Sequence, residues 1–207
     1  MMIYAIALCI GYFMGSVPFG LVLTRLAGTQ DLRSVGSGNI GATNVLRTGR
    51  KDLALATVIL DSIKAGLAFF ILWTVSADRS VALLAGASAF IGHCYPVWLG
   101  FKGGKGVATY AGFLLFSFWW QIFTVGAASW LGVLALTRIS SVSALVTALI
   151  VPLAAVITGT SHFEISILSV LSILVFWTHR ANLKRIMRGE EPKIGKQKAH
   201  ARDPIQP

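Results

Sequence analysis

Seven apolar runs, separated by short polar or glycine-rich breaks, make up most of this 207-residue chain. A run of about 20 apolar residues can cross the hydrocarbon core of a bilayer as a helix. We therefore expect an all-α integral membrane protein, a single domain over 1–207 with seven transmembrane helices. The fourth and fifth runs are short, so 107–137 forms either one very long helix or a tight hairpin. The expected spans lie at about 3–24, 53–75, 80–98, 107–119, 122–137, 141–158 and 164–178.

The composition fits a bilayer protein. Hydrophobic residues make up 55% of the chain and charged residues 13%, whereas a soluble domain carries roughly a quarter charged residues. The formal net charge of +10 would suggest nucleic acid in a soluble protein. Here the basic residues lie between apolar runs and in the tail, so we expect no nucleic-acid partner. The first run lacks the basic segment that opens a secretory signal, and we expect it to be retained.

Basic residues set the expected orientation, because cytoplasmic loops are enriched in lysine and arginine. With seven spans, every lysine and arginine except Lys64 and Arg79 falls on one side of the membrane. Six spans would place either Arg138 or the basic tail on the opposite side. We therefore expect the N-terminus outside, an outer turn at 119–121, and a basic cytoplasmic tail at 183–207.

The first break contains a glycine-rich polar stretch, GSGNIGATNVLR at 36–47. Glycine lets the backbone approach a ligand closely, and polar and arginine side chains donate hydrogen bonds to anionic oxygens. This composition indicates a site for a phosphorylated substrate, against the alternative of a flexible connector. The candidate site residues are Ser37, Gly38, Asn39, Gly41, Thr43, Asn44 and Arg47.

A second glycine-rich stretch follows the third run. It is not a Walker A loop for ATP, because that motif needs glycine where Leu99 stands and serine or threonine where Gly106 stands. Glycines beside a lysine can still cradle an anion through backbone N–H groups. The alternative is a basic anchor that only fixes the orientation. The candidate binding residues are Gly103, Gly104 and Lys105.

Further polar residues lie on the same expected side: His179 and Asn182 after the last run, and Ser141 and Ser143 where the sixth begins. His93, near a span end, is either a packed histidine or part of the site. The scattered histidines lack carboxylates at ligand spacing, so we expect no metal site.

Two ionisable residues lie inside the second run. Asp61 and Lys64 are three positions apart, so they can pair on one helix face. Charges at such depth are costly unless they are paired or face a polar cavity. The pair either fixes helix packing or supports the site.

Familiar machinery for a covalent acyl-enzyme is absent from the sequence. No histidine is followed by aspartate in an HxxxxD pattern, and no GxSxG nucleophile elbow occurs. Cys94 follows His93 directly, but both lie within an apolar run. We therefore expect catalysis by positioning and electrostatics, without a covalent intermediate.

Five motifs occur in order: GSVPFG at 15–20, GSGNIGATNVLR at 36–47, Asp61-x-x-Lys64 with Gly66, GHCYPVWLGFKGGKGVAT at 92–109, and HRAN at 179–182. Over about residues 11–195 they resemble the bacterial acyl-phosphate:glycerol-3-phosphate acyltransferase family. The resemblance implies a seven-span enzyme of the bacterial inner membrane with a cytoplasmic active site. Such an enzyme acylates position 1 of glycerol-3-phosphate with an acyl-phosphate, giving lysophosphatidic acid and inorganic phosphate, the first step of phospholipid synthesis. It implies no cofactor, and a soluble phosphate:acyl-carrier-protein acyltransferase as the source of the donor.

The reaction suggests roles for the candidate residues. Arg47 and Lys105 would neutralise phosphate charge, while Ser37, Asn182 and the other polar residues would orient the substrates. His179 acts as a base or only as a hydrogen-bonding group, and a substrate phosphate is the alternative proton acceptor. Two other classes compete with an enzyme. An organic-phosphate transporter would favour inverted repeats, which we do not see, and a structural membrane protein leaves the polar loops unexplained.

Overall fold

The computed structural model describes residues 1–195, except for the side chain of Trp119; the expected tail from residue 196 onward lies outside the described residues. Two short 3-10 helices, Leu46–Thr48 and Val97–Leu99, accompany the α-helices. The α-helices are α1 Met2–Gly15, α2 Phe19–Leu26, α3 Ala42–Val45, α4 Lys51–Ser76, α5 Arg79–Cys94, α6 Val107–Ser117, α7 Trp119–Thr137, α8 Ser140–Ile157, α9 His162–Thr178 and α10 Arg180–Met187.

The described residues form an all-helical membrane protein with five or six candidate spans. Five helical segments are long and apolar enough to cross a bilayer, and α9 with α10, bent by 59°, adds a sixth. The remaining expected span is α6, which has only 11 residues. At 1.5 Å per residue it extends about 16 Å, half of a hydrocarbon core of about 30 Å.

The first apolar run is interrupted where a continuous helix was expected over 3–24. α1 ends at Gly15 and α2 begins at Phe19, directly after Pro18. Proline lacks an N–H and disfavours helical geometry in the residue before it, so the chain opens here. The carbonyl oxygens of Ser16 and Val17 at this break accept hydrogen bonds from side chains elsewhere in the bundle, those of Trp98 and Lys64.

The fourth and fifth apolar runs form a hairpin, the second of the two alternatives. The break falls at Phe118 rather than at 119–121, because Trp119 already begins α7. α5 likewise ends at Cys94, two residues before Pro96, and so is shorter than the helix expected over 80–98.

Small residues let the helices approach closely. A Cβ atom added at Gly11 would lie 2.1 Å from the carbonyl oxygen of Ala85, and one at Gly15 would lie 1.9 Å from that of Ala89. α1 therefore packs backbone to backbone against α5, as small-residue interfaces allow in membranes. Gly112 of α6 packs in the same way on α4.

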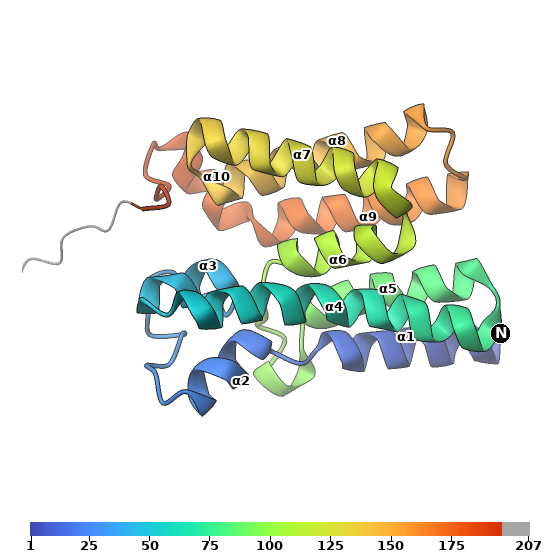
Figure 1. The fold of residues 1–207 in the computed structure, drawn as a ribbon, viewed down its shortest axis with the longest axis horizontal. Coiled ribbons are helices and arrows are strands. Elements are labelled where there is room, and N and C mark those ends of the chain that lie inside the picture. The colour runs from blue at the N-terminus through green and yellow to red at the C-terminus, as the bar shows by residue number, and fades with distance from the viewer. Residues whose placement is uncertain (196–207) are drawn as a thin grey trace, which may run out of the picture.

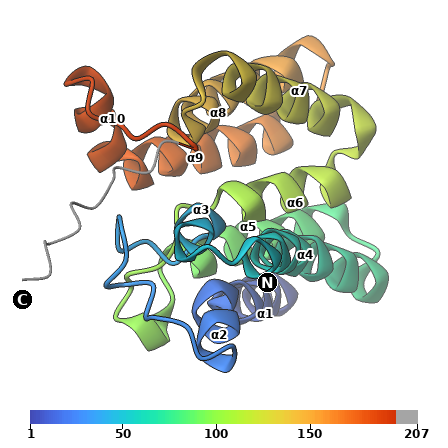
Figure 2. The same ribbon diagram turned by 60° about the vertical axis from the view of Figure 1, so that its left-hand side comes forward.

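The helices form two layers, α1, α4 and α5 in one and α7, α8 and α9 in the other, with α6 between them (Figures 1 and 2). The loop after α2, α3, the α7–α8 turn and α10 gather at one end, here called the loop end (Figure 1). At the opposite end, Arg79 pairs with Glu164 of α9 at 2.7 Å and donates to the Ser117 carbonyl at 2.6 Å. This arrangement brings together the polar stretches that the sequence marks as candidate sites.

Candidate active site

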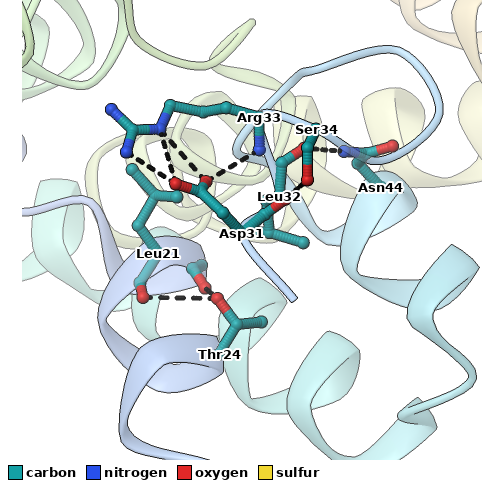
Figure 3. A network of polar contacts seen from close by, with 8 residues as sticks. Leu21, Thr24, Asp31, Leu32, Arg33, Ser34 and Asn44 are labelled. Carbon is teal, nitrogen blue, oxygen red and sulfur yellow. Dashed lines mark hydrogen bonds and ion pairs between the residues drawn. The ribbon is translucent and has the colours of Figure 1, made fainter. Parts of the chain in front are cut away.

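The first loop, residues 27–50, has its own small core. Leu32 and Val45 are fully buried and pack with Ala54 of α4. Beside Leu32, the Asp31 carboxylate and the Arg33 guanidinium form an exposed pair at 2.6 Å (Figure 3). These contacts give the glycine-rich stretch a fixed position, which a flexible connector would not have.

Asn44 organises this loop from within. Its buried amide donates to the carbonyl oxygens of Leu32 at 2.8 Å and Val35 at 2.9 Å. Its side-chain oxygen accepts from the Ser37 backbone N–H at 3.3 Å and from Arg47 Nη1 at 3.2 Å. Asn44 therefore positions Ser37 and Arg47, and its own amide group is already used by the protein.

The Arg47 side chain packs against Gly36, a position where the backbone requires glycine. Gly36 has φ +54°, and a Cβ added there would come within 2.8 Å of the Arg47 side chain. Ser37 and Arg47 are exposed and lie side by side next to Asn44. The loop thus presents a hydroxyl and a guanidinium together.

The remaining candidates of this loop shape its backbone. The Asn39 side chain accepts from the Gly41 N–H at 2.9 Å in a local turn, and Gly38 has φ +68°. Thr43 is exposed in the first turn of α3. Of these residues, only Thr43 offers a side chain that the turn itself does not use.

The second loop folds back onto the end of α5. The backbone N–H groups of Gly103 and Gly104 donate to the carbonyl oxygens of Cys94 and His93, each at 3.0 Å. A Cβ at Gly104 would lie 2.1 Å from His93 Nε2, so no other residue fits there without displacement. We call residues 103–105 the cradle.

The Lys105 ammonium has no hydrogen-bond acceptor among residues 1–195. Burial lowers the pKa of Lys105 to about 8, and the nearby positive charges of Arg185 and Arg47 act in the same direction. The amine therefore loses its charge as the pH rises through about 8. An anion bound beside it would favour the charged form.

His179 ends α9 beside the cradle. The hydroxyl of Thr178 donates to the Lys105 carbonyl oxygen at 3.2 Å. His179 Nδ1 lies 2.8 Å from the Val175 carbonyl oxygen, which can only accept, so Nδ1 carries the proton. In the neutral ring, Nε2 is then the atom able to accept a hydrogen bond.

A carboxylate that sequence reasoning missed organises the third cluster. Glu191 accepts from Asn182 Nδ2 at 2.5 Å, Ser141 Oγ at 2.8 Å and Arg185 Nε at 2.7 Å. Burial alone would raise the pKa of Glu191, but these hydrogen bonds lower it below its ordinary value. Ser143 does not join them, because its hydroxyl donates to the Ile139 carbonyl oxygen of its own helix.

The segment after α10 returns to the bundle. The Ile194 N–H donates to the Arg138 carbonyl oxygen at 2.7 Å, at the α7–α8 turn. The expected basic tail is thus helical up to Met187 and then contacts α8 through Glu191. The only sequence signal for this contact was the acidic pair at 190–191 within a basic tail.

The clusters lie close enough for their charges to act on one another. The pKa of Lys105 responds to Glu191, Arg185 and Arg47, which come from the segment after α10, α10 and the first loop. Lys105 and Arg47 form no ion pair with a carboxylate in the described part of the chain. The fold therefore places two cations that can still donate hydrogen bonds, Lys105 and Arg47, near neutral polar side chains. Among residues 1–195, no group of three His, Cys, Asp or Glu side chains gathers as a metal ion would require.

Comparisons with known proteins address the reaction. The family model described as Glycerol-3-phosphate acyltransferase matches residues 5–189. A Glycerol-3-phosphate acyltransferase of Hyphomonas neptunium is 56% identical over 200 residues, covering 96% of each chain. The chain belongs to the glycerol-3-phosphate acyltransferase family. The resemblance seen in the sequence motifs is confirmed. The chain is an enzyme, rather than the transporter or the structural protein considered as alternatives.

The fold of this acyltransferase matches solved structures. A crystal structure of PlsY, an integral membrane glycerol 3-phosphate acyltransferase, in its glycerol 3-phosphate form is 32% identical, with a TM-score of 0.85 over 93% of this chain and 96% of that one. The lysophosphatidic acid form of PlsY is 30% identical, with a TM-score of 0.84. At this identity the likeness supports an all-helical integral membrane acyltransferase.

Proposed function

We propose that this acyltransferase moves an acyl group from an acyl-phosphate to the position 1 hydroxyl of glycerol-3-phosphate. The products are lysophosphatidic acid and inorganic phosphate. One observation carries the proposal: Lys105 and Arg47 converge on one site from two loops, and neither is paired with a carboxylate in the described residues. Two phosphorylated substrates need two such cations. The forms in which PlsY was crystallised agree with this choice of acceptor and product.

The neighbours of the two cations suggest which substrate each one holds. Lys105 lies near His179 and near Glu191, which accepts a hydrogen bond from Asn182. His179 and Asn182 both offer hydrogen-bond acceptors. Asn182 Oδ1 is buried without a partner in the described chain, and His179 Nε2 has its lone pair free. An acceptor suits a hydroxyl group and repels a phosphate oxygen. We therefore place glycerol-3-phosphate with its phosphate on the cradle and its hydroxyls toward His179 and Asn182.

Arg47 and Ser37 then face the acyl-phosphate. Arginine makes bidentate contacts with phosphate, which fixes the leaving group and so the position of the acyl carbon that the hydroxyl attacks. Thr43 adds a hydroxyl at the same surface, and Asn44 keeps Arg47 in place. Gly38, Asn39 and Gly41 shape the backbone, and Ser141 belongs to the Glu191 cluster that holds Asn182. Ser143 is left as a packing residue of α8.

The reaction balances without a covalent enzyme intermediate. The hydroxyl oxygen attacks the acyl carbon, the carbon–oxygen bond to phosphate breaks, and the hydroxyl proton ends on the released phosphate. His179 Nε2 accepts the hydrogen bond from the hydroxyl and orients it. Acceleration comes from holding the hydroxyl against the face of the acyl carbonyl and from cations at the oxygens where negative charge develops.

The donor is tested with purified protein in detergent. We expect release of inorganic phosphate from a long-chain acyl-phosphate that depends on glycerol-3-phosphate, together with formation of lysophosphatidic acid. An acyl thioester offered at the same concentration should give no product. Equal use of the thioester would contradict the proposed donor. An intact protein mass increased by one acyl group would contradict the absence of an acyl-enzyme.

We further propose seven spans within a single membrane domain, with the N-terminus outside and the C-terminus and active site cytoplasmic, in the bacterial inner membrane. The basic residues of the first loop, the α7–α8 turn and α10 all lie at the loop end (Figure 1), as the positive-inside rule favours for a cytoplasmic face. α6 completes the count as a half-length helix. A cytoplasmic site is accessible to a soluble phosphate:acyl-carrier-protein acyltransferase, the proposed source of donor.

Cysteine labelling tests this orientation. In a background with Cys9 and Cys94 replaced by alanine, Gln121→Cys at the opposite end should react with an impermeant maleimide in intact spheroplasts. Ser34→Cys, an exposed residue of the first loop, is the matched control and should react only after the membrane is opened. The reverse pattern, or labelling of both sites from one side, would contradict the seven-span orientation.

A further inference from the structure

Three buried ionisable side chains meet beneath the cradle. Lys64 Nζ lies 2.7 Å from Asp61 Oδ1 and 2.8 Å from His93 Nδ1. It also donates to the Val17 carbonyl oxygen at 3.0 Å. The three side chains are each no more than 5% exposed. Charged groups at such depth are normally kept for function and carry an identifiable partner.

The geometry fixes the state of the histidine ring. An ammonium group has three hydrogens and no acceptor capacity. Lys64 therefore donates to all three of its neighbours, and His93 Nδ1 accepts. The proton of the neutral His93 ring must then be on Nε2, the edge that lies against Gly104.

His93 connects this cluster to the substrate cradle. Its carbonyl oxygen accepts the Gly104 N–H at 3.0 Å, and its ring fills the space that a Cβ at Gly104 would need. The ring therefore limits how closely the backbone that leads into Lys105 can approach the end of α5. Within residues 1–195 the ring is held by the hydrogen bond to Lys64, by Asp61 Oδ1 at 3.6 Å from Nδ1, and by packing.

The same ammonium holds the break between α1 and α2. Lys64 satisfies the Val17 carbonyl oxygen, and Trp98 Nε1 donates to the neighbouring Ser16 carbonyl oxygen at 3.0 Å. α2 in turn packs against the first loop, because Gly20 lies directly on the Ile40 carbonyl oxygen. One buried charge thus contacts the supports of both substrate-binding loops.

We propose that Asp61, Lys64 and His93 form a positioning network that sets the cradle for the phosphate of glycerol-3-phosphate. His93 transmits the position of Lys64 to Gly104, and Asp61 keeps Lys64 charged and oriented. None of the three touches substrate. The inference rests on the proposed placement of glycerol-3-phosphate in the cradle, and it predicts a defect in the binding of that substrate.

A neutral double variant separates this role from packing. Lys64→Met alone leaves the Asp61 charge buried with only the His93 ring beside it, and it should fold poorly. Asp61→Asn with Lys64→Met removes both charges at similar volume and should restore folded protein and its thermal midpoint. The donor to His93 and Val17 is still missing. We therefore expect KM for glycerol-3-phosphate to rise about tenfold or more, with KM for the acyl-phosphate changed less than about threefold.

The contact between His93 and Gly104 is tested by a second-site pair. Gly104→Ala places a methyl group against Nε2 and should raise the same KM. His93→Asn keeps an acceptor for Lys64 near the Nδ1 position and vacates the space that the methyl group needs. Gly104→Ala should therefore cost less in the His93→Asn background than in the wild type, by about threefold or more in kcat/KM.

The possible results are distinguishable. A well-folded double variant with wild-type KM for both substrates would overturn the positioning network while leaving the enzyme's function intact. If the losses in kcat/KM from Gly104→Ala and His93→Asn were additive, the proposed contact between the His93 ring and Gly104 would be overturned. Wild-type protein that released no phosphate from acyl-phosphate in the presence of glycerol-3-phosphate would instead overturn the proposed donor.

Discussion

Replacing Lys105 or Arg47 by alanine should lower kcat/KM at least tenfold, and the loss should be larger than for the other basic residues of their two loops. In the proposed site both residues would face phosphate charge near a low-dielectric boundary, where attraction is stronger than in water. Removing one member of such a charge contact costs roughly 2–5 kcal/mol, and each 1.4 kcal/mol is about tenfold in rate. Arg47→Lys should also be poor, because an ammonium cannot make the bidentate contact.

Lys102→Ala is the matched control. Lys102 lies three residues before Lys105 in the same loop. Its side chain is exposed and, unlike that of Arg47, makes no hydrogen bond to another side chain within residues 1–195, so solvent and salt screen its charge. Steady-state rates of phosphate release, measured for both substrates, compare the three variants. Similar mild losses in all three would mean that these residues set only the membrane orientation. In that case the site assignment is wrong.

The largest loss of stability is expected at the α1–α5 interface. Gly15→Ala places a methyl group 1.9 Å from the Ala89 carbonyl oxygen, which is backbone and cannot rotate away. The helices must separate, and overpacking of this kind costs about 1–3 kcal/mol or more. We expect a clear drop in the thermal midpoint of the purified protein and a lower yield of folded enzyme.

Gly132→Ala is the corresponding control, since this glycine is also within a helix. A Cβ added at Gly132 of α7 meets no atom within 4 Å. Alanine there should leave stability unchanged or raise it by about 0.5–1 kcal/mol, because glycine weakens a helix interior. If both variants melted at the wild-type temperature, close α1–α5 packing would not be required for the fold.

The membrane fold could be predicted from sequence because hydropathy and length act locally. Every apolar run contains a helix, since a backbone in hydrocarbon must satisfy its own hydrogen bonds. The break at Pro18 was also present in the sequence, but the length of the first run concealed it. The hairpin at Phe118 could not be placed to the residue. Its only local signals were two tryptophans and a glutamine, which α7 accommodates in its first turn.

The candidate site was only partly predictable, because side chains acquire roles through contacts between distant segments. Glycines and cations indicated two separate loops, and the fold brings the charges of Arg47 and Lys105 close enough to interact. Asn44 looked like a ligand and proves to hold the loop together, while Ser143 bonds within its own helix. Glu191 was missed, because nothing in a basic tail indicates that one carboxylate returns to Ser141 and Asn182.

The depth of the cradle below the start of α4 bears on how the two substrates reach the enzyme. α4 has 26 residues, and α5 reaches His93 after only 15, so the cradle lies roughly 15 Å below the start of α4. In the proposed site we therefore expect the reactive groups to meet at the depth of the lipid head groups and upper acyl chains. A donor with a long acyl tail arrives by lateral diffusion, and its effective concentration is its mole fraction in the bilayer. Glycerol-3-phosphate arrives from water, and its effective concentration is its molarity there. The two substrates thus reach the enzyme from two phases. Added lipid should lower the effective concentration of the acyl donor and leave that of glycerol-3-phosphate unchanged.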